Sequence, residues 1–221
     1  MSLNLTPLYL SLYVAITSSV LLLFISIPVS WVLSRYQDYF FIRFLEVVVS
    51  LPLVLPPTVL GFYLLIIFNP EYLIGKLYFK VVGENILFST AGLIFASILY
   101  SLPFAVQPMQ VAFKKINTDI IDQCFLLQSS KFKVFFSIIL PLSKNGVLSS
   151  FILSFAHTLG EFGVVLMVGG NIPGKTQVIS IAIYESVEML NFYVTHVLSL
   201  IILLISFVIL FLLFSLNRNE N

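Results

Sequence analysis

Charge is what this sequence has least of. Asp, Glu, Lys and Arg make up 10% of its 221 residues, whereas they supply about a quarter of a typical soluble domain. The net charge is +1 and no run of five basic residues occurs, which argues against electrostatic capture of nucleic acid. Cysteine occurs once, at Cys124, so an intrachain disulfide framework and a multi-cysteine metal site are both excluded.

Apolar residues make up 59% of the chain and the mean hydropathy is +1.07, which indicates an all-α integral membrane protein. A single membrane domain, residues 1–221, is expected to hold about five crossings, because a spanning helix needs roughly 20 apolar residues. Pro52, Pro56 and Pro57 are predicted to kink or break the second crossing. Residues 178–184 are too short to span and are predicted to be interfacial or re-entrant. The expected crossings lie at residues 8–33, 47–68, 86–113, 146–166 and 195–216, with a cytoplasmic loop at 117–145.

The distribution of Lys and Arg sets the expected orientation, because short cytoplasmic loops carry an excess of both. With the N-terminus outside and the C-terminus in the cytoplasm, eight of these residues lie inside and three outside. The loop at residues 117–145 is then cytoplasmic. The inner residues are Arg35, Arg43, Lys114, Lys115, Lys131, Lys133, Lys144 and Arg218, and the outer ones are Lys76, Lys80 and Lys175.

The cytoplasmic loop is the one long polar and basic interruption of the apolar chain, so it is where the protein is expected to meet a partner in water. Asn117 or Thr118 can cap a helix there, with Asp119 in its first turn. Apolar residues then recur at helical spacing, which predicts a short amphipathic helix. Pro141 is expected to interrupt the next helix near its start.

This loop resembles the EAA loop of ABC-importer permeases, with the pattern E-A-A, three residues, G, nine residues and I-x-L-P. Its second half matches closely, whereas its first half has drifted and Gln128 replaces the glycine. In that family the loop forms a coupling helix that sits in a groove on a separate ATPase subunit. The resemblance implies a coupling role for Asp122, Gln123, Cys124, Phe125, Gln128, Ile138, Leu140 and Pro141.

The fourth expected crossing places His157 and Glu161 four residues apart, on one face of a helix. A zinc site of the H-E-x-x-H type needs a second histidine and an adjacent glutamate, and both are missing, so metal or hydrolytic chemistry is not expected. Ionisable groups inside a membrane mark a pathway or a buried structural bond. Glu161 is therefore expected either to accept hydrogen bonds from a neighbouring backbone or to line a passage.

The segment GGNIPGKT, residues 169–176, satisfies the phosphate-loop pattern G-x-x-x-x-G-K-[ST] in full. Such a loop works inside an α/β domain of parallel strands, and the short remainder of the chain leaves no room for one. The charge distribution also places it outside, away from cytoplasmic nucleotide. A Pro-Gly turn at the external mouth of a passage is the preferred interpretation, formed by Asn171, Gly174, Lys175 and Thr176.

Three segments together, HTLGEFG, GGNIPGKTQVISIAIYE and SLPLVLPPTVLGFYLL, resemble the molybdate branch of ABC-importer permeases. The likeness extends from Leu8 to Phe214 and implies a type I ABC importer permease fold. It also implies a non-catalytic inner-membrane (cell-membrane) subunit that has no cofactor and works as a homodimer. The implied partners are a cytoplasmic ATP-binding subunit dimer and an external molybdate-binding protein. Tungstate and sulfate remain open, because these dianions nearly share molybdate's charge and shape.

A dianion needs a polar passage that binds it weakly, because desolvation in hydrocarbon is prohibitive and the ion must also leave. No Lys or Arg lies within an expected crossing to trap it. A membrane enzyme, a proton-coupled secondary transporter and a structural subunit are the alternative classes. The candidate lining residues are Pro56, Pro57, Thr58, Ser101, Gln107, Ser154, Thr158 and Glu161.

Overall fold

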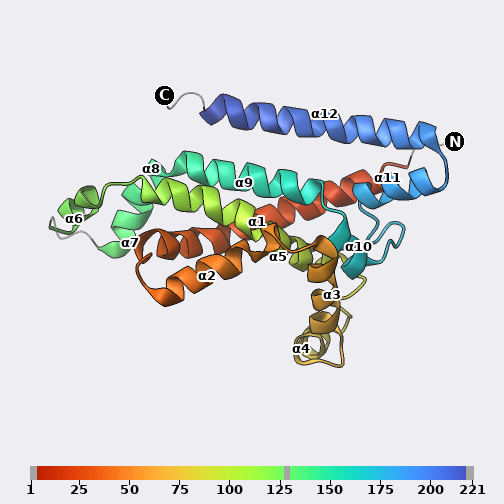
Figure 1. Ribbon diagram of the computed structural model, residues 1–221, viewed down its shortest axis with the longest axis horizontal. Helices are drawn as coiled ribbons and strands as arrows, with labels where there is room; N and C mark the ends of the chain where they lie inside the picture. The colour runs from red at the N-terminus through yellow and green to blue at the C-terminus, as the bar shows by residue number, and fades with distance from the viewer. Residues whose placement is uncertain (1–3, 127–129, 218–221) are drawn as a thin grey trace.

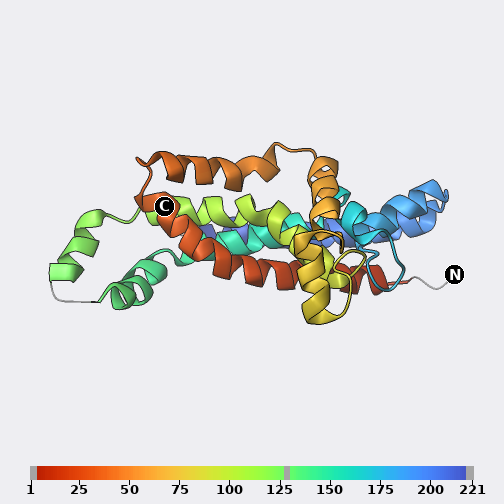
Figure 2. The same cartoon turned by 90° about the horizontal axis from the view of Figure 1, so that it is seen from below.

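The structure is a computed structural model that describes residues 4–126 and 130–217, and these residues form helices and loops without a strand. Three long helices lie side by side at the centre (Figures 1 and 2). They are α1 (Thr6–Arg35), α5 (Thr90–Lys114) and α9 (Lys144–Leu159). The fold is therefore a helical bundle built around one three-helix core.

Small side chains explain why these three helices pack closely. In α9, Gly146, Ser150, Ser154 and Thr158 recur every four residues, and the last three are buried. Membrane helices associate through such small residues, because they let backbones approach and leave more atoms in contact. Helix α1 contributes a similar buried stripe, formed by Ser11, Ala15, Ser18, Ser19, Ser26, Ser30 and Ser34.

The second expected crossing is broken, as its prolines predict. Helix α2 (Phe40–Ser50) and the short η1 (Leu51–Leu53) run beside α1, and α3 (Pro57–Phe68) leaves at 110° to them. Neither Pro56 nor Pro57 has an N–H to continue the ladder of hydrogen bonds. The helix also begins earlier than expected, at Phe40. Helix α4 (Leu73–Val82) packs on α3, and Figure 1 shows this pair projecting from the bundle.

The fourth expected crossing ends earlier than its apolar sequence suggests. Helix α9 stops at Leu159, where the N–H of Gly160 bonds to the carbonyls of Ala156 and His157, and α10 (Gly163–Gly169) follows. The short segment beyond it forms α11 (Ile179–Glu188). Helix α12 (Phe192–Asn217) closes the chain and lies along the outside of the bundle in Figure 1.

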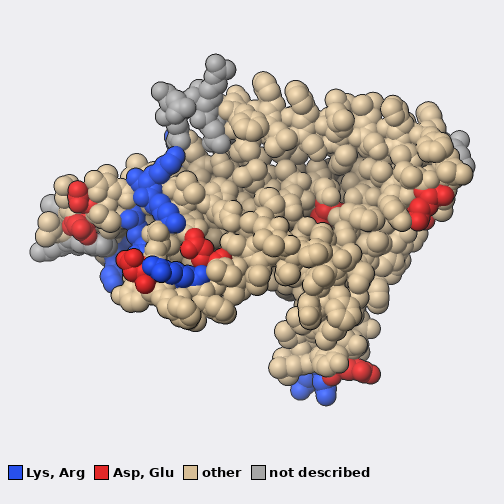
Figure 3. All heavy atoms as spheres, in the orientation of Figure 1, with Lys and Arg blue, Asp and Glu red and all other residues tan. Residues whose placement is uncertain are grey.

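Length and apolarity separate helices that can cross a bilayer from those that cannot. Among the described residues, α1, α5 and α12 qualify on their own, and there are up to five crossings if each of two bent helix pairs is one span. The most apolar part of α12 is only 11% buried, which suits contact with lipid. Figure 3 shows most visible Lys and Arg gathered at the end of the molecule that carries α6 and α7, with a smaller group at the tip of α4.

Candidate functional site

The polar loop folds into a short helix, α6 (Thr118–Leu126), as the sequence predicts. Asn117 caps it, because its side-chain oxygen accepts a hydrogen bond of 3.0 Å from the backbone N–H of Asp119. Ile121 is buried and Cys124 is half-buried, whereas Asp122 and Gln123 are exposed. Figure 2 shows α6 extending beyond the ends of the core helices, so its polar face is open to a partner.

Two of the expected coupling residues are Phe125 and Gln128. Gln128 lies outside the described residues, and so does the Phe125 side chain. The chain is described again from Ser130, whose side chain caps α7 (Lys131–Val134) by accepting a 3.3 Å bond from Lys133 N.

The path from α6 to α9 contains a distorted helix. A π-helical turn, η2 (Phe135–Ile139), follows α7 and leads into α8 (Leu140–Leu142), and the whole segment meets α9 at 69°. Pro141 lies just after the π-helical turn, where its missing N–H leaves a helical carbonyl without the usual donor. Ile139 is buried in the same apolar cluster as Ile121. One apolar cluster therefore includes residues of α6 and of the π-helical turn, with Val147 of α9 packed against it.

The start of this loop is fastened to α1. Arg35 donates from Nη2 to the carbonyl of Phe113 (3.2 Å), in the last turn of α5, and to that of Ile116 (3.3 Å), just beyond the helix. Its guanidinium also lies 4.7 Å from the centre of the Trp31 ring. The end of α1 thus fixes the point from which the polar loop departs.

A cavity of about 620 Å³ lies where α9 ends, between α3, α5 and α10. It is lined by Pro57 and Thr58, by Tyr100, and by His157 and Glu161, together with apolar residues. The wall between α3 and α10 is tight, because a Cβ added at Gly163 would lie 2.7 Å from Pro57 Cβ. Pro57 and the HTLGEFG segment therefore meet at one place.

His157 is held by α5. The Ser101 hydroxyl lies 2.8 Å from His157 Nδ1 and 2.8 Å from the hydroxyl of Thr158, and the Phe104 ring stacks on the imidazole with centroids 3.9 Å apart. The contacts of His157 with the rings of Phe104 and Tyr100 were not predicted from the sequence. This arrangement fixes the orientation of His157, and no group of three potential metal ligands occurs among the described residues.

Glu161 is 4% exposed and lies just past the end of α9. Its backbone carbonyl accepts a hydrogen bond from the Ser180 hydroxyl, at 2.5 Å. Neither carboxylate oxygen, however, accepts a backbone hydrogen bond within the described part of the chain, and the buried Ser97 hydroxyl is the side chain that interacts with it. The expectation that the carboxylate accepts backbone hydrogen bonds is therefore wrong for this structure. The alternative expectation, that Glu161 lines a passage, stays a prediction: the residue is part of the cavity wall, but both of its carboxylate oxygens are buried.

The GGNIPGKT segment forms a turn rather than a phosphate loop. Lys175 N bonds to the carbonyl of Ile172 at 3.1 Å, and Gly174 has φ of +73° at the third position of the turn. The Thr176 hydroxyl is buried, donates to the Gly169 carbonyl at 2.6 Å and accepts from Ile172 N at 3.0 Å. These bonds use the loop's own groups to close it, and the predicted Pro-Gly turn is confirmed.

Comparison with known proteins identifies the family. The model of the family "Binding-protein-dependent transport system inner membrane component" matches residues 26–219. The chain belongs to this family. Such a permease component is a non-catalytic membrane subunit, and the family implies a substrate-binding partner and an ATP-binding partner. The type I permease fold implied by the resemblance is confirmed by the family and by the all-helical architecture of the described residues.

The permease chain is similar over nearly its whole length to named relatives. It is 42% identical over 97% of its length, and 95% of the relative's, to the molybdenum transport system permease protein ModB of Azotobacter vinelandii. It is 35% identical to ModB of Haemophilus influenzae, over 84% of this chain and 80% of that one. It is also 33% identical to a probable sulfate transport permease, cysT, of Chlorella vulgaris, over 84% of this chain and 69% of that one.

In this permease the predicted passage residues divide into two groups. Pro57, Thr58 and Glu161 line the cavity beside α3, and Ser101 and Thr158 lie behind His157 in the same place. The rest lie apart from it. Pro56 is exposed, the hydroxyl of buried Ser154 donates to its own helix, and Gln107 lines a second cavity near the opposite ends of α5 and α9.

Proposed function

We propose that this chain is the membrane subunit of an ATP-driven importer that passes molybdate across the inner membrane. The observation that carries the proposal is the 42% identity to a molybdenum permease over 97% of this chain and 95% of the relative. A likeness that spans both chains end to end includes the passage, the coupling region and the external loop. The complete importer contains two copies of this chain, an ATP-binding subunit dimer and an external molybdate-binding protein.

Helix α6 supplies the contact to the ATP-binding subunit. Its exposed Asp122 and Gln123 enter the groove on that subunit, and Cys124, with Phe125 and Gln128, completes the contact. Movement of α6 then passes through Ile138, Leu140 and Pro141 to α9. The support for this path is the apolar cluster that includes residues of both α6 and η2, together with the 69° bend at which this segment joins α9.

The passage lies beside the cavity at the end of α9. Its wall contains the hydroxyls of Thr58 and Tyr100, with Glu161 at the break after the helix, and no Lys or Arg is among its lining residues. Hydroxyl groups can donate hydrogen bonds to a dianion, and without Lys or Arg the surface does not trap it. Asn171, Gly174, Lys175 and Thr176 form the external mouth, with the N-terminus outside and the C-terminus in the cytoplasm.

Uptake by the reconstituted transporter tests the proposal. The chain, its ATP-binding subunit and its binding protein are placed in proteoliposomes, and ATP-dependent accumulation of molybdate is compared with that of sulfate. Molybdate uptake that needs both ATP and the binding protein supports the proposal. Uptake of sulfate without uptake of molybdate would contradict the proposal and support the second candidate function, sulfate import. The identity to the sulfate permease relatives favours this second function.

Copurification tests the coupling helix separately. Asp122→Arg reverses an exposed charge on α6, and Asp38→Arg reverses an exposed charge in the loop after α1. Loss of the ATP-binding subunit from Asp122→Arg, with normal recovery from Asp38→Arg, places the contact on α6. Equal recovery with both variants would show that α6 does not carry it.

A further inference from the structure

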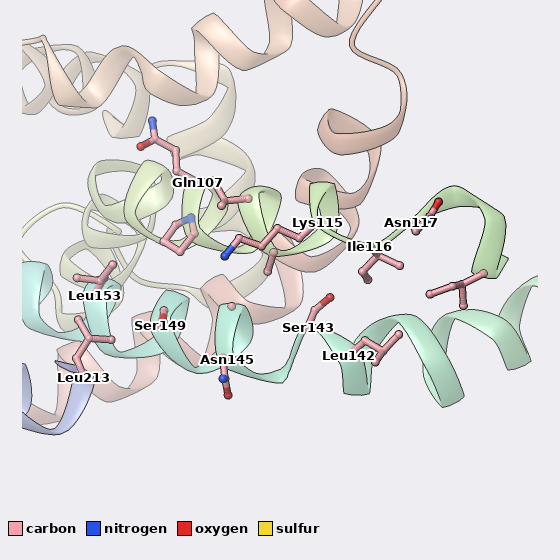
Figure 4. Close-up of a pocket in the computed structure, with 15 residues that line it drawn as sticks. Gln107, Lys115, Ile116, Asn117, Leu142, Ser143, Asn145, Ser149, Leu153 and Leu213 are labelled. Carbon is pink, nitrogen blue, oxygen red and sulfur yellow. The ribbon is translucent and has the colours of Figure 1, made fainter. Parts of the chain in front are cut away.

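The second cavity has a volume of about 810 Å³ and lies where α5 ends and α9 begins, close to the polar loop. Apolar side chains from α5, α6, α8, α9 and α12 form most of its wall, with Leu213 contributed by α12. Four polar side chains line it near the loop, namely those of Lys115, Asn117, Ser143 and Asn145. Figure 4 shows the Lys115 side chain extending into the space between α5 and α9.

Ser143 is the first unusual feature of this cavity. The residue is 2% exposed, and its hydroxyl has no hydrogen-bond partner in the described structure. It is the residue before α9, where a serine side chain ordinarily caps the helix, yet it makes no capping bond here. Figure 4 shows its hydroxyl directed from the start of α9 toward α5. A buried hydroxyl without a partner is costly, which points to a ligand that accepts a hydrogen bond from it.

The start of α9 is the second feature. Helix α9 is 16 residues long, and no side chain caps it. Its first N–H groups lack helical acceptors, and its dipole places partial positive charge at this end. Lys115 adds a full positive charge. No Asp or Glu is among the lining residues described, and the Asn117 amide is occupied by Asp119, to which it donates at 3.3 Å.

We infer that this cavity holds a tetrahedral oxyanion between Lys115, the Ser143 hydroxyl and the free N–H groups at the start of α9. Each group donates, and together they match the acceptor-only surface of a phosphate-like ion. The ligand is either the free transported oxyanion or the phosphate of an anionic phospholipid, whose acyl chains suit the apolar wall. The inference rests on the proposed function in two respects only: that the cavity lies on the cytoplasmic side, and that molybdate is the free ion.

Binding to the purified full-length chain tests the site without any transport step. Equilibrium dialysis in a neutral detergent measures molybdate and inorganic phosphate, and native mass spectrometry in nanodiscs measures retained phosphatidylglycerol against phosphatidylcholine. The variants are Lys115→Gln and Ser143→Ala. The matched control is Lys114→Gln, since Lys114 is exposed, adjacent in sequence and outside the cavity lining.

For a free ion we expect one saturable molybdate or phosphate per chain. Affinity should fall at least tenfold in Lys115→Gln, about threefold in Ser143→Ala and less than twofold in the control. For a lipid phosphate we expect one retained phosphatidylglycerol, lost in the same order, and no saturable free ion. The inference is overturned if neither ligand binds saturably, or if the two cavity variants bind like Lys114→Gln. Failure of the proposed function would instead appear as absent molybdate uptake, whatever these binding results are.

Discussion

Replacing Gly146 with alanine is expected to separate α9 from α5 at the joint next to the polar loop. Gly146 is the first member of the small-residue stripe on α9. A Cβ added there would overlap the Cβ of Ala112 and lie 3.3 Å from the carbonyl oxygen of Pro108. Two carbons are at optimal contact about 3.5 to 4.0 Å apart, so α9 must move away by roughly 1 Å. The clash is with backbone and with a rigid methyl group, and neither can rotate aside.

The magnitude follows from two opposing effects. Overpacking of a well-packed interface costs about 1–3 kcal/mol, whereas replacing glycine by alanine within a helix gains about 1 kcal/mol. Because the added Cβ overlaps the Ala112 Cβ outright, the cost lies in the upper part of this range, about 2–3 kcal/mol, and the net loss is then about 1–2 kcal/mol. For a chain of this size it corresponds to a melting temperature lower by roughly 2–8 °C, on the scale of about 2–4 °C per kcal/mol.

Thermal melting of the purified chain in a mild detergent measures this loss. Gly160→Ala is the matched control, because a Cβ there meets nothing closer than 3.8 Å. Ala112→Gly in the Gly146→Ala background removes the overlapping methyl group and should recover much of the stability. The reasoning is refuted if Gly146→Ala melts with the control, or if the second substitution gives no recovery.

Three further predictions use the same melting assay. Thr176→Val should lower stability by about 2–3 kcal/mol, because it leaves the Gly169 carbonyl and the Ile172 N–H without their buried partner. Arg35→Lys should cost about 1–2 kcal/mol, since an ammonium cannot reproduce a guanidinium that serves two carbonyls and stacks on an indole. Glu161→Gln should raise the melting temperature by a few degrees, because its buried carboxylate accepts no backbone hydrogen bond among the described residues.

Each of these predictions has its own control and its own contradicting result. Thr176→Ser keeps the hydroxyl and should melt like the parent. If Thr176→Val is as stable as the parent, the loop does not depend on this hydroxyl. Arg43→Lys alters an exposed arginine and should change little, so an equal loss in both variants would remove the special role of Arg35. A lower melting temperature for Glu161→Gln would contradict the prediction, because it would mean that the carboxylate makes a stabilising interaction in the folded protein.

Much of the architecture could be predicted because it depends on local chemistry. The cap at Asn117, the break at Pro56 and Pro57 and the turn at Gly174 each follow from a few neighbouring residues, and the structure shows all three. The phosphate-loop match was set aside for lack of an α/β domain, and the described residues indeed form none. Helix bounds were less accurate, since apolar sequence continues past Leu159 although α9 ends there.

The candidate sites depend on residues far apart in the chain, and here the sequence was less informative. It indicated that Glu161 was notable but not that the residue lines a cavity while its carboxylate is buried. It did not predict that Ser101 and Phe104 hold His157, or that Lys115 and Ser143 line one cavity between α5 and α9. A small-residue repeat at a spacing of four in α9 was the available indication of where the helices would approach.

The sequence by itself determined that this chain is a helical membrane protein, where its polar loop lies and which permeases it resembles. Those properties follow from hydrophobicity, proline and short motifs, and they need no knowledge of which helices are neighbours. Tertiary structure alone decided which polar groups share a cavity and which are left without a partner. The physical reason is that hydrogen-bond satisfaction and close packing depend on distances between helices, and small residues such as Gly146 fix those distances only once the bundle has formed.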